Sequence, residues 1–270
     1  MIKQKILIPI FKKILKSLSG RGLQKYEFLN KSKSTIISQL KSDFAIVQAH
    51  KMFLGPKDSL QLSINGIYEE LETNIVKKEI KPGDIILDIG ANIGYYTLIF
   101  ANLVGKNGKV FAFEPEPSNF ELLQKNIHMN NYKNIIFEQK AVGKVEKKID
   151  LYLSEKRTGM HRIYKSKYTS DNSVPVDMIN LDNYFMNNYK NQEINFIKID
   201  IEGSEFGALQ GLQNILKNEN IKLLTEFIPD SIREFGAYPE EFIKLLQSNN
   251  FSIYCTDDQN KKIIKMDGYD

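Results

Sequence analysis

The sequence of 270 residues predicts an α/β fold in which helices cover both faces of a mostly parallel central sheet. Two observations carry this prediction. Short apolar runs, typical of strands buried on both faces, alternate with segments of helical periodicity from residue 60 onward. Several of these runs end in an acidic residue, and one of them, "DIILDIG", leads into a glycine turn and a helix. Because ligands bind at the carboxyl ends of parallel strands, those acidic positions form the candidate site.

Charge divides the chain into two parts, a basic segment at residues 1–60 and a domain at residues 61–270. The net charge is +4, but residues 1–41 carry ten Lys or Arg and the single acid Glu27, so this piece has a charge of +9. Leu7, Phe11, Ile14 and Leu18 recur at helical spacing in the basic segment, which predicts a partly helical structure.

Two interpretations of this basic segment stay open. In one it packs on its own domain, and in the other it lies peripherally on an anionic membrane surface through residues 1–41. The apolar run from Ile6 to Phe11 has six residues, which is shorter than a secretory core of about 7–15 residues or a span of about 20. Cys255 is the only cysteine, which excludes a disulfide within the chain and a cysteine-built zinc site and favours a cytoplasmic setting.

The expected elements follow in order. The run "DIILDIG" is a strand, with a helix from Tyr95 to Leu103, and "GKVFAFEPEP" is a strand, with a helix from Ser118 to Met129 for which Ser118 is the expected N-cap. The remaining expected elements are the strands "NIIFEQKAV", "KKIDLYL" and "INFIKIDIEG", a helix through Leu209 and Leu216, the strand "IKLLTEF", a helix from Pro239 to Ser248, and the strands "FSIYC" and "KKIIKM". Residues 154–175 fit neither periodicity, and we expect a substrate lid there.

The glycine turn indicates the kind of cofactor. A dinucleotide fingerprint needs three glycines, but Asn92 stands between Gly90 and Gly94, and no Lys-Ser/Thr pair follows as in a phosphate loop. The carboxylate of Asp88 would repel a pyrophosphate and suits a cationic ligand. Glu114, which closes the next strand, can accept both ribose hydroxyls. These features favour S-adenosylmethionine, which carries a sulfonium and an ammonium group and has no phosphate.

Five blocks of sequence carry a resemblance to a known family. They are "GIYEELET", "KPGDIILDIGANIGYYT", "VFAFEPEPSNFELLQKNI", "QKAVG" and "FIKIDIEGSEFGALQG", which run in this order between residues 66 and 211. With these blocks the chain resembles the FkbM-type methyltransferases of the class I, Rossmann-like fold. The resemblance implies transfer of a methyl group from S-adenosylmethionine to a hydroxyl of a sugar, a glycan, a glycolipid or a related small molecule. The cofactor-binding residues that it implies are Glu72, Thr73, Asp88, Gly90, Ala91, Asn92, Gly94, Glu114, Pro115, Asn119, Ala141 and Val142.

Methyl transfer to an alcohol also needs a group that takes up the hydroxyl proton. The segment "IDIEGSE" places Asp200 and Glu202 at the end of a predicted central strand, two residues apart. Glu226 ends the strand "IKLLTEF" at the same edge of the sheet, and His161 in the expected lid is the rival base. The sequence leaves open which of these four residues is the base and whether a divalent ion lies among the acids. No histidine or cysteine pattern indicates a metal site.

Two other functions stay open. The lysines of the basic segment could follow the phosphates of a nucleic acid, so methylation of a nucleic acid is the second hypothesis. The sequence lacks the "NPPY"-like signature of base methylation where "DIEG" stands, and we expect no specific nucleic-acid partner. The third hypothesis is a cofactor-binding interaction module without catalysis.

Overall fold

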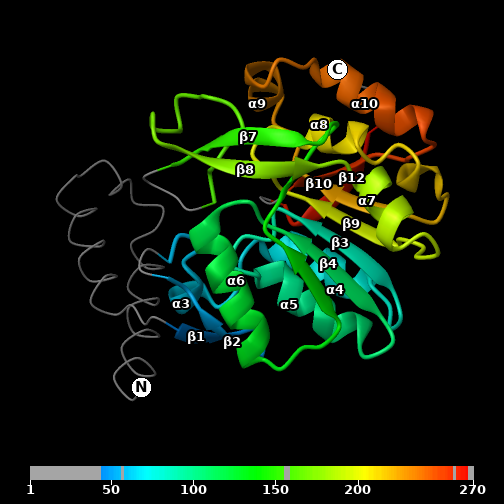
Figure 1. Cartoon of the computed structure of the whole chain (residues 1–270). Helices are drawn as coiled ribbons and strands as arrows, with labels where there is room; N and C mark the ends of the chain where they lie inside the picture. The colour runs from blue at the N-terminus through cyan, green and yellow to red at the C-terminus, as the bar shows by residue number, and fades with distance from the viewer. Residues whose placement is uncertain (1–43, 56–57, 155–158, 258–259, 267–270) are drawn as a thin grey trace.

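A five-stranded, fully parallel sheet forms the centre of the computed structural model, which describes residues 44–55, 58–154, 159–257 and 260–266 (Figure 1). Its strand order is β10-β9-β3-β4-β5. The bounds are Ile85–Ile89 for β3, Lys109–Phe113 for β4, Ile135–Glu138 for β5, Phe196–Ile199 for β9 and Lys222–Thr225 for β10. The predicted fold class is confirmed.

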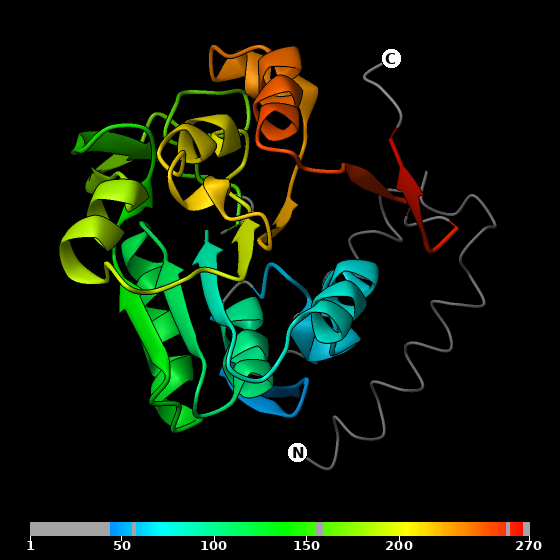
Figure 2. The same cartoon turned by 90° about the vertical axis from the view of Figure 1, so that its right-hand side faces the viewer.

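Helices pack on both faces of this sheet (Figures 1 and 2). Buried side chains of α4 (Glu70–Glu79), α5 (Tyr95–Val104) and α6 (Pro117–Met129) form one core. Those of α7 (Leu181–Asn188), α8 (Glu205–Gln210), the short helix η2 (Ile215–Lys217), α9 (Pro229–Glu234) and α10 (Pro239–Ser248) form the other. In β3, Ile86 faces the first core and Leu87 the second, and both are fully buried. Burial on both faces explains why the strands have near-continuous apolar sequences.

The chain reverses its direction of travel across the sheet between β3 and β9. It runs from β3 outward to β4 and β5, and it then crosses back to place β9 and β10 on the other side of β3. Such a reversal opens a crevice at the carboxyl ends of the two strands. The loops beyond β3 and β9 approach closely there, since a Cβ atom at Gly90 would lie 1.9 Å from the carbonyl oxygen of Asp200.

In the described ranges, three smaller sheets accompany the central one. The strands β6 (Ala141–Val142), β8 (Ser173–Ile179) and β7 (Lys147–Tyr152) form a three-stranded sheet. A hairpin of β1 (Phe44–Val47) and β2 (His50–Phe53), which is followed by α3 (Leu62–Asn65), packs on α6. The Asn126 side chain of α6 holds this hairpin by accepting the Phe53 N–H at 2.6 Å and donating to the Phe53 carbonyl at 3.0 Å.

The C-terminal strands do not join the central sheet. The structure confirms that "FSIYC" and "KKIIKM" contain strands, but β11 (Tyr254–Asp257) and β12 (Lys262–Lys265) pair only with each other among the described residues. Their hairpin lies beside α4 (Figure 2), where Lys261 Nζ donates to Glu70 Oε2 at 2.6 Å. The outer edge of β10 is therefore free of a neighbouring strand in the described part of the chain.

The expected N-cap at Ser118 is wrong, because α6 begins one residue earlier, at Pro117. Glu116 is the N-cap, and its carboxylate accepts the backbone N–H of Asn119 at 2.6 Å. Proline suits the first helical position because the missing N–H has no intrahelical partner there. Residues 1–43 lie outside the described residues, and so does the expected N-terminal helix. Within the described ranges, no helix has the length and apolar character needed to cross a membrane.

Candidate active site

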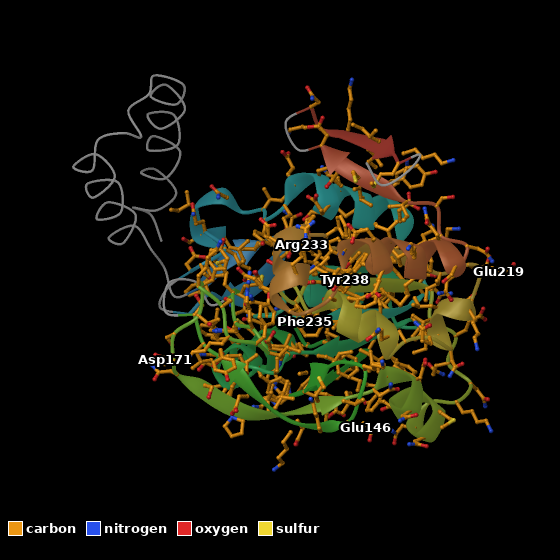
Figure 3. All side chains as sticks on the ribbon, turned by 90° about the horizontal axis from the view of Figure 1, so that it is seen from above. Glu146, Asp171, Glu219, Arg233, Phe235 and Tyr238 are labelled. Atoms are coloured by element: carbon orange, nitrogen blue, oxygen red, sulfur yellow. The ribbon has the colours of Figure 1, made fainter. Side chains whose placement is uncertain are left out.

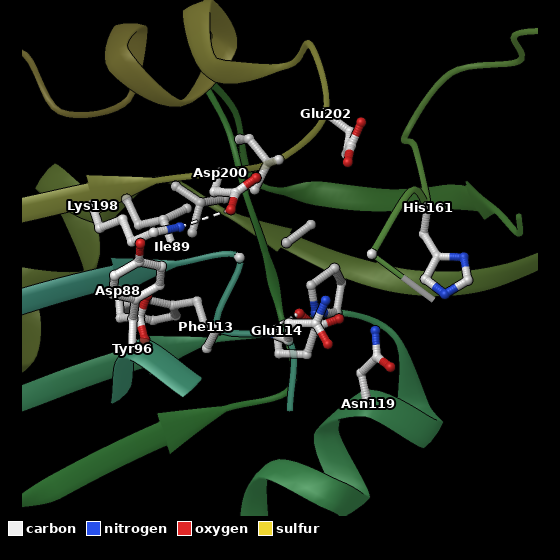
Figure 4. A pocket seen from close by; sticks show the side chains of 18 of the residues that line it. Asp88, Ile89, Tyr96, Phe113, Glu114, Asn119, His161, Lys198, Asp200 and Glu202 are labelled. Atoms are coloured by element: carbon white, nitrogen blue, oxygen red, sulfur yellow. Dashed lines mark hydrogen bonds and ion pairs between the residues drawn. The ribbon is translucent and has the colours of Figure 1, made fainter. Parts of the chain in front are cut away.

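A cavity lies at the carboxyl ends of β3, β4 and β9, and we call it the turn cavity (Figure 4). Its lining contains most of the positions that the sequence predicted for cofactor binding. These are Asp88, Gly90, Ala91, Asn92, Glu114, Pro115, Asn119, Ala141 and Val142. Residues that are more than fifty positions apart in the sequence meet here because parallel strands bring their ends to one edge of the sheet.

Backbone geometry explains the glycine turn. Gly90, Asn92 and Gly94 all have positive φ angles, of 86°, 51° and 92°. A side chain at Gly94 would also collide with Leu123 of α6, because its Cβ would lie 2.8 Å from a methyl group. Asn92 is the non-glycine residue that tolerates this conformation best, and its Oδ1 accepts the following backbone N–H at 2.8 Å. Gly94 itself does not line the cavity and serves the packing of α5 against α6.

Glu114 is fixed at the rim of β4 by two backbone hydrogen bonds. Its Oε2 accepts the N–H of Asn92 at 2.8 Å, and its Oε1 accepts the N–H of Glu116 at 3.0 Å. Burial raises the pKa of Glu114 to about 7, although both backbone bonds act in the opposite direction. The Asn119 side chain also hydrogen-bonds this carboxylate, which lowers its pKa. A carboxylate offers about four lone-pair sites, so this rigid group can still accept from a hydroxyl.

Asp88 ends β3 and is completely enclosed. Its Oδ2 accepts a hydrogen bond from Thr97 Oγ1 at 2.5 Å, while its Oδ1 is buried without a partner among the described residues. Burial raises the pKa of Asp88 to about 6. A buried carboxylate oxygen without a hydrogen-bond donor is costly, so a ligand that brings a donor beside Oδ1 would be stabilised.

Lys198 is a site residue that the sequence reasoning missed. It projects from the middle of β9, with only 4% of its surface exposed, and its Nζ lies 2.7 Å from Asp200 Oδ2 (Figure 4). The same ammonium group lies 4.5 Å from the ring centre of Tyr96. Burial alone lowers the pKa of Lys198, but the nearby carboxylates of Asp200, Asp88 and Glu69 outweigh burial and raise it. The sequence does contain a signal for this residue, a lysine inside the apolar run "INFIKID". Because an unpaired buried charge is not tolerated, such a lysine requires an acidic partner.

The predicted acids at the ends of β9 and β10 do come together. Carboxylate oxygens of Asp200, Glu202 and Glu226 lie within 4.8 Å of one another. Their approach depends on a turn rather than on an extended strand, since β9 ends at Ile199 and Glu202 has a φ of 58°. We call these three residues the acid cluster.

The acid cluster contains two groups with strongly shifted pKa values. Burial, followed by the Asp200 carboxylate, raises the pKa of Glu202 to about 7. Burial and the carboxylates of Asp200, Glu202 and Glu205 raise the pKa of Glu226 to about 9. Burial and mutual repulsion of the carboxylates thus favour a retained proton on Glu226, and to a smaller extent on Glu202, near neutral pH.

The segment expected to be a lid supplies one wall of the turn cavity and a cation for the acid cluster. Gly159, His161 and Ile163 line the cavity. Arg162 is 2% exposed, and its guanidinium lies 3.5 Å from Glu202 and 3.1 Å from Glu234 of α9. The described part of this segment is thus tied to the carboxyl end of β9.

The other predicted residues lie elsewhere around the site. His161 lies near Asn119 in Figure 4, and its Nδ1 accepts the backbone N–H of Ser154 at 3.0 Å. Thr73 is fully buried and donates to the carbonyl of Tyr68 at 2.7 Å, without lining the turn cavity. Glu72 and Glu226 line a neighbouring cavity instead, which runs along the free edge of β10 and is called the edge cavity.

Comparison with known proteins gives a family match over most of the chain. A model of the methyltransferase FkbM domain matches residues 88–253. Methyltransferase 1 of Beauveria bassiana is 25% identical over 173 residues, which cover 54% of this chain and 69% of that protein. Hexuronic acid methyltransferase AglP of Haloferax volcanii is 25% identical over 195 residues, which cover 67% of this chain and 69% of that protein.

Two further similarities are shorter or more distant. The 31-O-demethyl-FK506 methyltransferase FkbM of Streptomyces tacrolimicus is 46% identical over 48 residues, 18% of either chain. Among solved structures, the methyltransferase FkbM of Methylobacillus flagellatus superposes with a TM-score of 0.46 and 15% identity. That superposition covers 77% of this chain and 52% of the Methylobacillus chain.

Proposed function

The chain belongs to the FkbM methyltransferase family, and from this premise we propose that it methylates a hydroxyl group on a sugar or glycan, with Asp200 taking up the hydroxyl proton. The methyl donor of the family is S-adenosylmethionine. When bound, this donor supplies a methyl group on a positively charged sulfur and leaves as a neutral thioether.

The turn cavity has the chemistry that this donor requires. The buried and unpartnered Oδ1 of Asp88 would accept from the ammonium of the methionine part. The fixed carboxylate of Glu114 would accept the two ribose hydroxyls, and Ala141 and Val142 offer an apolar surface for adenine. A pyrophosphate in the same place would face two buried carboxylates, which argues against a dinucleotide.

The position of Asp200 carries the catalytic part of the proposal. Asp200 lines both the turn cavity and the edge cavity, so its carboxylate stands where a donor and an acceptor would meet. Methyl transfer requires the attacking oxygen about 3 Å from the methyl carbon, which makes positioning a large part of the rate. The oxygen must also lose its proton as the new bond forms, and a carboxylate within hydrogen-bond reach can take it. Lys198 holds the Asp200 carboxylate in place through the ion pair at 2.7 Å.

A sugar acceptor is supported by one relative and by the chemistry of the site. The Haloferax relative is named as a methyltransferase of hexuronic acid, and it matches 67% of this chain. The acid cluster brings three carboxylates together beside Lys198 and Arg162, and carboxylate oxygens suit a ligand that offers several hydroxyl groups.

The direct test is methyl transfer with the purified full chain. S-adenosylmethionine with an isotope-labelled methyl group is offered together with neutral hexosides, amino sugars, hexuronates and, separately, RNA. We expect label in a sugar, with a mass increase of one CH₂ group, and none in RNA. Label in RNA, or no transfer to any sugar by protein that binds the donor, would overturn the proposal.

A further inference from the structure

The edge cavity has the size of a small-molecule site and lies outside the donor site. It encloses about 480 Å³, within the range of about 300–1,000 Å³ that ligand pockets occupy. Its walls come from β10, from α10 and from the segment that leads into the C-terminal hairpin. The hairpin stands apart from the central sheet (Figure 2), and the cavity occupies the space beside the unpaired edge of β10.

This cavity meets the turn cavity at two residues. Lys198 and Asp200 line both of them. A molecule in the edge cavity can therefore place one of its groups beside the Asp200 carboxylate. The edge cavity is for this reason the place where an acceptor would be held.

At the end of the edge cavity near Asp200, carboxylates outnumber the one ammonium group in the lining, that of Lys198. Oε2 of Glu72 and Oε2 of Glu226 are both buried, and neither has a hydrogen-bond partner in the described ranges. Glu69 also lines this end, and burial raises its pKa. Buried acceptor atoms of this kind call for a ligand that brings donors, as a sugar does with its hydroxyls. A sugar that carries its own carboxylate would bring further acceptors instead of donors to these atoms, which disfavours it.

The far end of the edge cavity is apolar. Leu223 of β10, Leu246 of α10 and Ile253 before the hairpin form its wall. Tyr254 continues this surface and is 56% exposed. A free sugar would leave this wall in contact with water, whereas an apolar group attached to the sugar would cover it and gain about 25 cal/mol for each Å² removed from water.

We propose that the edge cavity is the acceptor site and that it takes an amphipathic acceptor, a neutral sugar linked to an apolar group. The sugar hydroxyls bind Glu72 and Glu226, one of them faces Asp200, and the apolar group lies along β10 toward Tyr254. This assignment rests on the proposed function only in that the hydroxyl facing Asp200 is the one that becomes methylated.

The only cysteine of the chain gives a direct probe of this cavity. Cys255 lines the edge cavity and is exposed, so a maleimide can reach it. We expect n-octyl β-D-glucoside, used below its micelle concentration, to slow the alkylation of Cys255 by N-ethylmaleimide in the full-length protein. Glucose and n-octyl β-D-glucuronide should need concentrations higher by about tenfold or more for equal protection, a difference of at least about 1.4 kcal/mol in binding.

A relocated cysteine is the matched control. In the double variant Cys255→Ser/Ile263→Cys the thiol stands on the neighbouring strand β12, outside the cavity lining and at a position that is 53% exposed. The glucoside should leave the alkylation rate of this variant unchanged. Equal protection at both positions, or protection by glucose as good as by the glucoside, would overturn the assignment of an amphipathic ligand.

A second measurement separates the acceptor site from the methyl-transfer function. Protein alkylated at Cys255 with a bulky maleimide should bind S-adenosylhomocysteine as the untreated protein does and should lose transfer to n-octyl β-D-glucoside by about tenfold or more. Unchanged transfer after complete alkylation would remove the edge cavity as the acceptor site and leave the proposed function intact. Specific protection of Cys255 in a protein that methylates no sugar would support the binding site and overturn the proposed function.

Discussion

Lys198 and Asp200 form an ion pair with an Nζ–Oδ2 distance of 2.7 Å, in which the lysine side chain is 5% exposed and the aspartate side chain 21%. The lysine lies within the central sheet, where its charge also balances Asp88 and Glu69. Positive charge at this point allows several carboxylates to gather around the two cavities. The pair therefore links the stability of the fold to the chemistry of the site.

Replacement of Lys198 tests this link. Lys198→Met leaves its carboxylate partners without a cation and should lower the free energy of unfolding by about 3 kcal/mol. This value is at the low end of the range for broken buried ion pairs, because Asp200 is partly exposed. The double variant Lys198→Met/Asp200→Asn should recover part of the loss, as measured by urea denaturation. Lys222→Met removes a surface pair with Glu79 and should cost about 0.2–1 kcal/mol. A Lys198→Met loss no larger than this would contradict the role of the pair.

Asp200→Asn tests the proposed base. The change keeps the shape of the side chain and removes the charge, so turnover should fall by about 10²–10⁴ while the affinity for S-adenosylhomocysteine changes little. Steady-state methyl transfer and calorimetry give the two readings. Glu121→Gln, on the exposed side of α6, is the control and should be as active as the wild type. Undiminished turnover of Asp200→Asn would move the base to Glu202, Glu226 or His161.

Glu114→Ala tests the donor site. Because hydrogen bonds to a charged acceptor contribute about 1.5–3 kcal/mol, the affinity for S-adenosylhomocysteine should fall by a corresponding factor of roughly 10 to 150. Calorimetry measures this loss, with Glu121→Ala on the exposed side of α6 as the control that should bind normally. NAD should show no binding to the wild type. Binding of NAD, or full affinity in Glu114→Ala, would refute the assignment of the turn cavity.

Glu226→Gln should change how stability depends on pH. Burial and the neighbouring carboxylates raise the pKa of Glu226 from 4.5 to about 9, so between these values the folded protein keeps a proton that the unfolded chain has lost. The folded state then binds more protons, and its stability falls as the pH rises through this range. Glutamine removes this dependence, and the stability of the variant relative to wild type should grow from pH 5 to pH 9.

Urea denaturation at pH 5, 7 and 9 measures the effect. The exposed Glu219 on the surface of the molecule (Figure 3) provides the control, because Glu219→Gln should give the same difference from wild type at all three values. A Glu226→Gln difference that is constant with pH would show that Glu226 titrates as an ordinary glutamate in the folded protein.

The basic N-terminal segment gives the last prediction. If residues 1–41 bind an anionic surface, the full chain should sediment with phosphatidylserine vesicles at low salt, since each lysine near the surface contributes about 1 kcal/mol. A chain that begins at Ser42 should stay folded and lose this binding. The truncation must stop there because Val47 and Met52 of the first hairpin are buried in the core of the domain. If the full chain does not sediment with the vesicles, the interpretation that the basic segment packs on its own domain is the one that remains.

Much of the fold follows from local patterns in the sequence. The runs around Leu87, Phe111 and Ile197 are apolar on both sides, which only a covered parallel sheet explains. Because parallel strands end at one edge of the sheet, the sequence alone predicts that Asp88, Glu114 and Asp200 lie close together. The turn at Gly90 and Asn92 is also predicted by the sequence, because few residue types accept positive φ angles.

Other features depend on contacts between distant segments. The pairing of β11 with β12 apart from the sheet is not visible in their sequences, since an apolar strand fits either an edge or a hairpin. The start of α6 at Pro117 rather than at Ser118 depends on how Glu116 meets the end of β4. Long-range packing decides both features, and the periodicity of residues along the sequence carries no information about such packing.

The sequence by itself therefore determined the sheet, the glycine turn and the carboxylates at the strand ends, because burial and backbone sterics act within a few residues. Only the tertiary structure decided how those carboxylates share charge. It paired Lys198 with Asp200, brought Glu226, which follows β10, within 4.8 Å of two acids of the β9 loop, and formed the edge cavity beside them. Electrostatic energy depends on distances of a few ångströms between side chains far apart in the sequence, and these distances exist only after the chain has folded.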